Sequence, residues 1–278
     1  MIFARDKSQM CNNLLQFAHV YAWAREHDRS VMSMRFSYKY PYFKIRHTKY
    51  VSFPLYLLAK YAAALRLLPT ANYKHIERDL DREEQKILRH KHVVVSGWYA
   101  RWYDLFLKYR SEICDLFTID EALTKPVSER MSAEEASVNG ECIRLGVHIR
   151  RGDYKEWGGG MYYYEDDVYA SYINAFARTM QGKDIEVYLS TNDPQVTAET
   201  YAKLVPSPAV NVHLLGGNAA EDLFMLSECD YIIGPPSTYS LVAAMYRDIP
   251  LCRMDQTNAE TMSLEDFKLF DYWFRRIV

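Results

Sequence analysis

The chain has 278 residues, 49% of them hydrophobic, which is enough apolar material for one large core or two smaller ones. Its net charge is only −2, and its longest apolar stretch, residues 51–68, carries Pro54, Lys60 and Arg66, which argues against a membrane-spanning helix. The N-terminus shows no signal-peptide pattern, and five scattered cysteines form no Cys-x-x-Cys pair. We therefore expect a soluble protein of a reducing compartment, the cytoplasm.

The charge is distributed unevenly along the chain. Residues 1–110 carry 20 Lys and Arg against 9 Asp and Glu, whereas the remaining residues carry 14 against 27. A basic half favours a polyanion or an anionic membrane surface as a neighbour. Two domains that simply differ in surface charge would give the same pattern, so both interpretations stay open.

The first half of the chain alternates short apolar runs with helical patterns. In chain order we expect a strand at residues 1–4, a helix at 11–27, a strand at 30–34, helices at 51–68 and 74–89, a strand at 93–95 and a helical region at 99–117. The apolar residues of the first helix recur at helical spacing and predict a single apolar face. Residues 120–140, which include Pro126, are typical of a connection between domains.

The second half repeats the alternation more clearly. Strands are expected at residues 142–149, 185–190, 210–215, 231–234 and 251–254, and helices between them at 166–180, 194–204, 221–229 and 237–246. This order predicts an α/β fold with a parallel, doubly wound sheet, in which ligands bind beyond the carboxyl ends of the strands. We expect one domain at 1–130, a second at 140–260, and a C-terminal helix at 261–278 that packs back across the domains.

The segment His148-Ile149-Arg150-Arg151-Gly152-Asp153 lies where the first strand of the second half ends. Side chains alternate along a strand, so His148 and Arg150 should point the same way. The planar fork of an arginine suits two oxygens of a phosphate, and Asp153 can hold an arginine in one rotamer. A salt bridge that merely closes the strand is the alternative, but two arginines beside a histidine favour an anion site.

Two further segments lie just past strand ends. In Gly234-Pro235-Pro236-Ser237-Thr238-Tyr239-Ser240, the prolines stop a strand and small hydroxyl residues begin a helix, whose free N–H groups suit an anion. An ordinary serine N-cap is the alternative interpretation. In the segment at 221–230, Asp222 lies in a first helical turn, where the helix dipole favours carboxylates. Asp222 could also accept the paired N–H donors of a guanine edge.

These segments resemble a known family. Residues 147–154 are similar to the His-x-Arg-Arg-x-Asp signature of α-1,2- and α-1,6-fucosyltransferases, residues 221–230 and 237–240 resemble the later motifs of glycosyltransferase family 11, and residues 11–18 resemble its loop-helix entry. The resemblance implies a GT-B fold, with two Rossmann-like domains facing a cleft. It also implies inverting, α-1,2-type transfer of fucose from GDP-fucose to a galactoside-type acceptor, without a metal or other cofactor.

The resemblance assigns roles to particular residues. Arg150 would bind the β-phosphate and stabilise the leaving group, with His148 and Arg151 as further donor contacts; Asp222 would take the guanine, and Ser237, Thr238 and Tyr239 would hold the phosphates. Asn12 would lie near the reacting sugar. The general base stays open: Asp153 is available but can equally orient an arginine, and His148 is either a base or a nucleotide contact. Ser8 and Gln9 replace the family's usual Gly and Arg, so Arg5 or Lys7 would supply the missing positive charge.

The basic and aromatic stretch at 36–47 suits sugar rings and phospholipid headgroups, and a tyrosine-rich core segment is the equal alternative. We expect a cytoplasmic enzyme that touches the inner membrane and acts on an oligosaccharide or a lipid-linked glycan. Three other functions stay open: a transferase for another GDP-sugar or nucleotide-sugar, a non-catalytic nucleotide-sugar-binding relative, and a nucleic-acid-binding module. The last is disfavoured because the ligand motifs lie in the acidic half.

Overall fold

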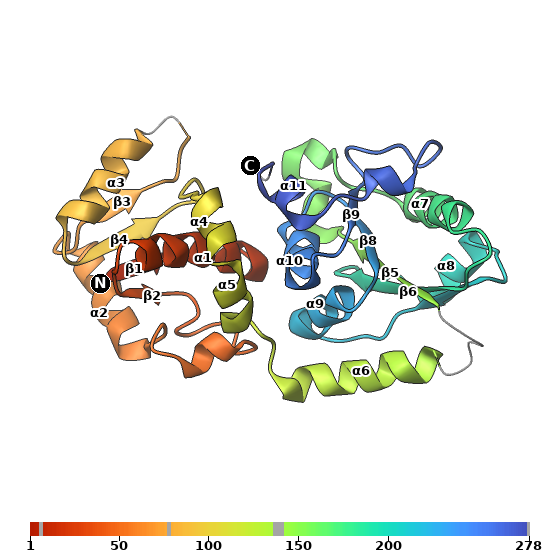
Figure 1. Cartoon of the computed structure of the whole chain (residues 1–278), viewed down its shortest axis with the longest axis horizontal. Helices are drawn as coiled ribbons and strands as arrows, with labels where there is room; N and C mark the ends of the chain where they lie inside the picture. The colour runs from red at the N-terminus through yellow and green to blue at the C-terminus, as the bar shows by residue number, and fades with distance from the viewer. Residues whose placement is uncertain (6–7, 77–78, 136–141, 277–278) are drawn as a thin grey trace. The chain divides into compact units, whose positions relative to one another are not determined.

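The structure, a computed structural model, describes residues 1–5, 8–76, 79–135 and 142–276 (Figure 1). The chain divides into two compact units, Met1–Asp120 and Glu121–Ile277. Each unit contains one sheet, and every strand pair in both sheets is parallel. The expected α/β fold with parallel sheets is therefore confirmed.

The first unit has a four-stranded sheet in the order β2-β1-β4-β3. Its strands are β1 (Ile2–Arg5), β2 (Val31–Ser33), β3 (Thr70–Asn72) and β4 (Val93–Ser96), and its helices are α1 (Met10–Glu26), α2 (Phe53–Ala64), α3 (Leu80–Arg89), α4 (Tyr103–Lys108) and α5 (Arg110–Leu116). Sequence periodicity missed β3, because its residues, Thr70-Ala71-Asn72, form no apolar run. The single helical region expected at 99–117 is two short helices that meet at Tyr109.

Helix α1 differs from its prediction. Instead of one apolar face, it is buried around most of its circumference from Met10 to Ala24, and the polar side chains of Asn13 and His19 are buried with the rest. A helix enclosed on all sides needs no polar face. It therefore forms the centre of the first unit.

The basic and aromatic stretch at 36–47 divides between core and surface. Phe36 and Phe43 are buried and pack their rings within 6.0 Å of one another and against Phe117. Lys39 and Arg46 are exposed. The core interpretation thus holds for the phenylalanines, whereas the cations face solvent.

The second unit has a five-stranded sheet in the order β7-β6-β5-β8-β9. Its strands are β5 (Ile143–Ile149), β6 (Ile185–Thr191), β7 (Val210–His213), β8 (Tyr231–Gly234) and β9 (Leu251–Arg253), and its helices are α6 (Glu121–Glu135), α7 (Asp166–Thr179), α8 (Ala198–Leu204), α9 (Ala219–Ser227), α10 (Thr238–Arg247) and α11 (Phe270–Phe274). All five strands expected from sequence are present.

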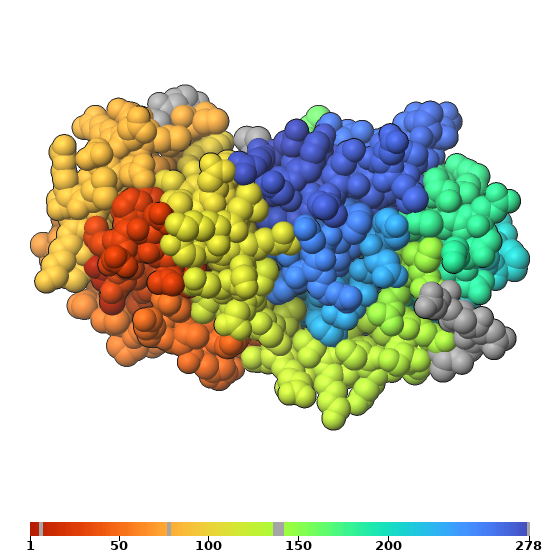
Figure 2. Space-filling view, in the orientation of Figure 1, coloured from red at the N-terminus to blue at the C-terminus, as the bar shows by residue number. Residues whose placement is uncertain are grey.

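Helices cover both faces of this sheet. On one face, α7 and α8 pack on Leu145, Val147 and Ile149 of β5. On the other face, α9 and α10 pack together and α6 lies against α9 (Figures 1 and 2, light blue and blue for α9 and α10). Gly146 faces α9 so closely that a Cβ there would meet Leu226 Cδ2 at 2.8 Å. The sheet is therefore doubly wound.

Two connections differ from expectation. Residues 121–135, expected within a connection, form α6 with Pro126 inside it, and Glu135 at its end makes an ion pair of 2.7 Å with Arg144. Residues 136–141 lie outside the described part of the chain. Within residues 261–276, helix is confined to a 3₁₀ turn at Leu264–Asp266 and to α11, where Trp273 Nε1 donates to the Leu251 carbonyl at 2.7 Å.

Candidate active site

The order of the second sheet reverses between β5 and β8. β6 and β7 follow β5 on one side, whereas β8 and β9 lie on its other side. In parallel α/β sheets a crevice opens at such a reversal, beyond the carboxyl ends of the strands. β5 ends at Ile149 and β8 at Gly234, so the segments beginning with Arg150 and Pro235 both start at this point.

Strand alternation sends His148 toward α10. The His148 side chain is buried, and the centre of its ring lies 5.0 Å from that of Tyr239. Gly234 packs against it so closely that a Cβ added at Gly234 would lie 3.1 Å from the Cβ of His148. Its Nδ1 is buried and has no hydrogen-bond partner among the described residues. Burial, with a smaller effect of the Arg150 cation, lowers the pKa of His148 to about 3. The imidazole is therefore neutral at pH 7 and too weak a base to accept a proton there.

Arg150 lies immediately beyond β5 with its guanidinium partly exposed. Its Nη2 is 2.7 Å from Asp153 Oδ1, and its guanidinium carbon lies 5.6 Å from the centre of the Tyr154 ring. The Asp153 side chain is more than half exposed, so it orients the arginine without burying it. Arg150 keeps donors available for an anion.

Arg151, the next residue, has the opposite environment. Its side chain is only 6% exposed and is held between Asp166 and Asp193, with its Nε donating to the Tyr164 carbonyl at 3.1 Å. The following turn at Gly152 has φ +43°, and a Cβ there would meet Asn192 Nδ2 at 2.6 Å. The Nε, Nη1 and Nη2 atoms of Arg151 thus each donate to a protein acceptor, whereas the resemblance implied a nucleotide contact for this residue.

Asp222 lies in the first turn of α9. Ser190 Oγ, at the end of β6, donates to its Oδ2 at 3.3 Å. Burial raises the pKa of Asp222 to about 6, although the serine hydroxyl opposes this effect. The neighbouring Glu221 is instead part of a capping box with Asn218. Asp222 is thereby left as the carboxylate that can receive a ligand's N–H groups.

Helix α10 begins at the carboxyl end of β8. Ser237 is its N-cap and accepts from the backbone N–H of Tyr239 at 3.2 Å, so the ordinary capping role is present. The Tyr239 hydroxyl donates to the Ala219 carbonyl at 2.8 Å, which joins α10 to α9. The positive end of the α10 dipole therefore lies at the sheet reversal, where the Ser237 hydroxyl caps the Tyr239 N–H.

Sequence reasoning missed two residues that shape this site. The Tyr154 hydroxyl donates to the Pro236 carbonyl at 2.7 Å and so ties the segment after β5 to the segment before α10. Ser190 holds Asp222 across the sheet. Tyr154 ends the segment that resembles the arginine signature but is not one of its defining residues, and Ser190 belongs to no motif; only the strand order brings each to its partner.

The remaining predicted residues belong to the first unit. Asn12 lies in the first turn of α1, where its Nδ2 donates to Ser8 Oγ at 2.8 Å. Ser8 has φ +80°, a left-handed conformation that glycine adopts without strain. Arg5 ends β1, at the carboxyl edge of the first sheet, and burial lowers the pKa of its guanidinium. Lys7 lies outside the described residues.

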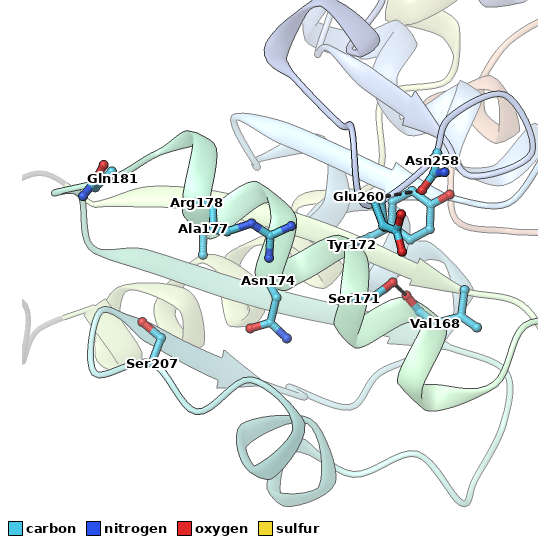
Figure 3. A pocket seen from close by; sticks show the side chains of 11 residues that line it. Val168, Ser171, Tyr172, Asn174, Ala177, Arg178, Gln181, Ser207, Asn258 and Glu260 are labelled. Carbon is cyan, nitrogen blue, oxygen red and sulfur yellow. Dashed lines mark hydrogen bonds between the residues drawn. The ribbon is translucent and has the colours of Figure 1, made fainter.

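A separate hollow of about 1060 Å³ lies beside α7 and the chain at 258–260 (Figure 3). Figure 3 shows the side chains of Asn174, Arg178 and Ser207 spread around it without converging on one point. It lies on the α7 face of the sheet, whereas His148 points to the opposite face, which is covered by α10 and by α9, the helix that carries Asp222. We therefore place the candidate active site at the sheet reversal and not in this hollow.

The residues grouped at the sheet reversal suit a nucleoside diphosphate. Arg150 and the N-terminus of α10 offer positive charge and N–H donors, Asp222 offers two acceptor oxygens, and His148 offers a buried neutral ring nitrogen. Among the described residues, no group of three or more His, Cys, Asp or Glu side chains could hold a metal ion. Within the same residues, no helix is long and apolar enough to cross a membrane.

No protein-family model and no curated protein sequence matches the chain. Solved structures do match. FUT1 of Arabidopsis thaliana, an arginine-to-lysine mutant in complex with GDP, has a TM-score of 0.62 and 13% identity over 96% of this chain and 73% of its own. The α-1,6-fucosyltransferase NodZ with GDP has a TM-score of 0.56 and 15% identity over 92% of this chain and 94% of its own, and NodZ from Bradyrhizobium scores 0.55.

POFUT1 in complex with GDP also matches, with a TM-score of 0.54 and 12% identity over 89% of this chain and 94% of its own. These matches cover most of the chain, so they include both α/β units. The two Rossmann-like units are accordingly those of the GT-B fold seen in fucosyltransferases.

Proposed function

We propose that this chain is an inverting fucosyltransferase, which transfers L-fucose from GDP-fucose to a hydroxyl of a galactoside-type glycan in an α-1,2-like linkage, without a metal. The observation that carries the proposal is the convergence of Arg150, Asp222 and the N-terminus of α10 at the reversal of the second sheet. The shared fold supports it, since FUT1, NodZ and POFUT1 were all solved with GDP.

In this proposal the second unit binds the donor. Asp222 accepts the N–H groups of the guanine edge, and the first N–H groups of α10, capped by Ser237, bind the diphosphate. Arg150, fixed by Asp153, meets the phosphate that leaves. Negative charge grows on this phosphate as the bond to fucose breaks, so donors already aimed at it lower the barrier without reorganising.

We propose three changes to the assigned roles, each supported by the contacts described above. Asp153 acts through Arg150, as a positioning residue. Arg151 holds the segment after β5 to Asp166 and Asp193 and leaves the nucleotide to Arg150. His148 is neutral at pH 7. It makes a hydrogen bond to the GDP-sugar and does not serve as the general base.

The acceptor side belongs to the first unit. Asn12, with Ser8 beside it, contributes to the acceptor end of the reaction at the carboxyl edge of the first sheet. The acceptor is an oligosaccharide or a lipid-linked glycan, and the enzyme works in the cytoplasm in contact with the inner membrane. Nucleic acid is not a partner in this proposal.

Calorimetric titration of GDP, with and without EDTA, tests the donor site. We expect binding to the wild type that EDTA does not change, and loss of most of it in Arg150→Ala. The rate of transfer from GDP-fucose should fall on the order of 100- to 1,000-fold in this variant. This is the loss typical when one hydrogen-bond donor to a developing negative charge is removed. Arg247→Ala is the matched control, because Arg247 is exposed and paired with Glu228 on the surface.

Each contrary result has a defined meaning. Absence of GDP binding in the wild type would contradict the donor site itself. GDP binding without turnover of any nucleotide-sugar would identify a non-catalytic relative. Hydrolysis of another GDP-sugar in preference to GDP-fucose would keep the fold and the site but change the transferred sugar.

A further inference from the structure

Helix α2 has the composition of a buried helix and the exposure of a surface helix. Its sequence, Phe-Pro-Leu-Tyr-Leu-Leu-Ala-Lys-Tyr-Ala-Ala-Ala, contains one charged residue, yet Ala59 is its only fully buried member. Ala59 packs on Phe3, Met34 and Val94 of the first unit. A helix that is apolar all round is normally enclosed by other parts of a protein. Here one side has no covering element within the described chain.

The uncovered side forms a continuous apolar stripe. Leu58, Tyr61 and Leu65 follow one another at intervals of three and four residues, with exposures of 65%, 58% and 69%. Phe53 at the start of the helix and Leu67 just beyond it are 52% and 76% exposed. Exposed large apolar side chains that are contiguous, unlike scattered ones, mark a surface that meets a partner.

The chain around this stripe contains only positive charge. Between Asp28 and Glu77 there are nine Lys and Arg and no Asp or Glu. The exposed cations of this region are Lys39, Lys44, Arg46, Lys49, Lys60, Arg66 and Lys74. Lys44 has a partner from elsewhere, Asp115 at 2.6 Å. The whole chain has slightly more acidic than basic residues, so a long stretch with cations and no carboxylates favours a negatively charged partner.

The cations and the apolar stripe are held together by packing. Tyr38 stacks on Tyr56 of α2 with ring centroids 4.6 Å apart, and the Ser52 N–H donates to Ser37 Oγ at 3.0 Å, so the segment that carries Lys39 is attached to the start of the helix. Lys60 lies within the helix, with its Nζ 5.6 Å from the centre of the Tyr61 ring. Lys39 and Lys60 thus lie on the same surface as the apolar stripe of Leu58, Tyr61 and Leu65, and we call this surface the α2 face.

We propose that the α2 face docks the protein on an anionic phospholipid surface, with the stripe in the acyl region and the cations at the headgroups. This combination of a short apolar helix with Lys and Arg beside it is the chemistry that lies in a membrane interface without spanning it. A symmetric contact between two copies fits less well. Such a contact would place Lys60 and Arg66 of one copy close to the same cations of the other copy. The chain between Asp28 and Glu77 offers no carboxylate to compensate for this repulsion.

Co-sedimentation with vesicles tests this surface on the full-length protein. We expect binding to vesicles of equimolar phosphatidylglycerol and phosphatidylcholine, weakening as salt is added, and at least tenfold weaker binding to phosphatidylcholine alone. Leu58→Glu with Leu65→Glu should abolish binding to both. Lys39→Glu with Lys60→Glu should remove the preference for the anionic lipid.

The control is Leu264→Glu, an exposed leucine of the second unit, which should bind vesicles like the wild type. GDP binding, measured on every variant, separates loss of lipid binding from loss of fold and from failure of the proposed donor site. Wild-type protein that ignores anionic vesicles at low salt would overturn the proposal. So would dimerisation in light scattering that Leu58→Glu with Leu65→Glu abolishes while vesicle binding is unchanged.

Discussion

Arg150 and Arg151 are identical neighbours with opposite environments. Arg150 keeps part of its guanidinium in solvent beside Asp153, whereas Arg151 is enclosed by Asp166 and Asp193. They differ because successive side chains leave a strand end on opposite sides. The α9 and α10 side carries the candidate donor site, and the α7 side carries the carboxylates that fix the loop.

This division predicts different consequences of mutation. Arg151→Ala leaves two carboxylates without their cation, one of them only 14% exposed, and should lower the free energy of unfolding by about 3 kcal/mol. Arg247→Ala, which removes an exposed pair, should cost about 1 kcal/mol or less. Urea denaturation measures both. Equal stability of the two variants would show that the Arg151 cluster is not structural.

The raised pKa of Asp222 predicts that binding of GDP at the proposed site depends on pH. Because burial raises its pKa to about 6, the carboxylate is ionised above pH 6 and protonated below it. Only the ionised form offers both oxygens to guanine N–H groups, so affinity for GDP should rise with pH through this range, by about tenfold per unit on the acid side.

Titration calorimetry at several pH values, on wild type and Asp222→Asn, measures this dependence. The variant should bind GDP weakly and keep only the pH dependence of the ligand's own phosphate. Parallel pH profiles for the two proteins would exclude Asp222 from the guanine site.

At the scale of elements, the site depends on how closely α9 approaches β5. Gly146 permits this approach, because any side chain there would enter the space of Leu226 and Cys229. Gly146→Ala should therefore destabilise the protein by about 1–3 kcal/mol through overpacking.

The test is a double-mutant cycle with Leu226→Ala, followed by denaturation. The cost of Gly146→Ala should shrink in the Leu226→Ala background, because the smaller side chain makes room for the new methyl group. If the two costs simply add, the close contact does not limit this position.

At the scale of the whole molecule, the two units have separate sheets and cores, and the proposed donor site lies entirely in the second. GDP should therefore slow amide hydrogen exchange around residues 150–154, 217–222 and 235–240. The strands β1 to β4 of the first unit should exchange at an unchanged rate. Protection confined to residues 1–120 would assign nucleotide binding to the other unit.

Local pattern was sufficient for much of this protein. Alternating apolar strands and helices predicted the parallel sheets and all five strands of the second unit, because burial on both faces leaves a continuous apolar run in each strand. The positions of Arg150 and Ser237 just past strand ends followed from the same runs. Strand and cap signals lie within a few neighbouring residues, so the sequence carries them by itself.

Tertiary structure decided the rest. The pairing of Tyr154 with Pro236 and of Ser190 with Asp222 depends on strand order, which no local pattern encodes. The sequence of helix α6 contains Pro126 and is typical of a connection. Contacts with the rest of the second unit, including the ion pair between Glu135 and Arg144, nevertheless stabilise it as a helix. Burial in the folded protein lowers the pKa of His148 and raises the pKa of Asp222. The same tertiary packing determines which side of α2 remains exposed.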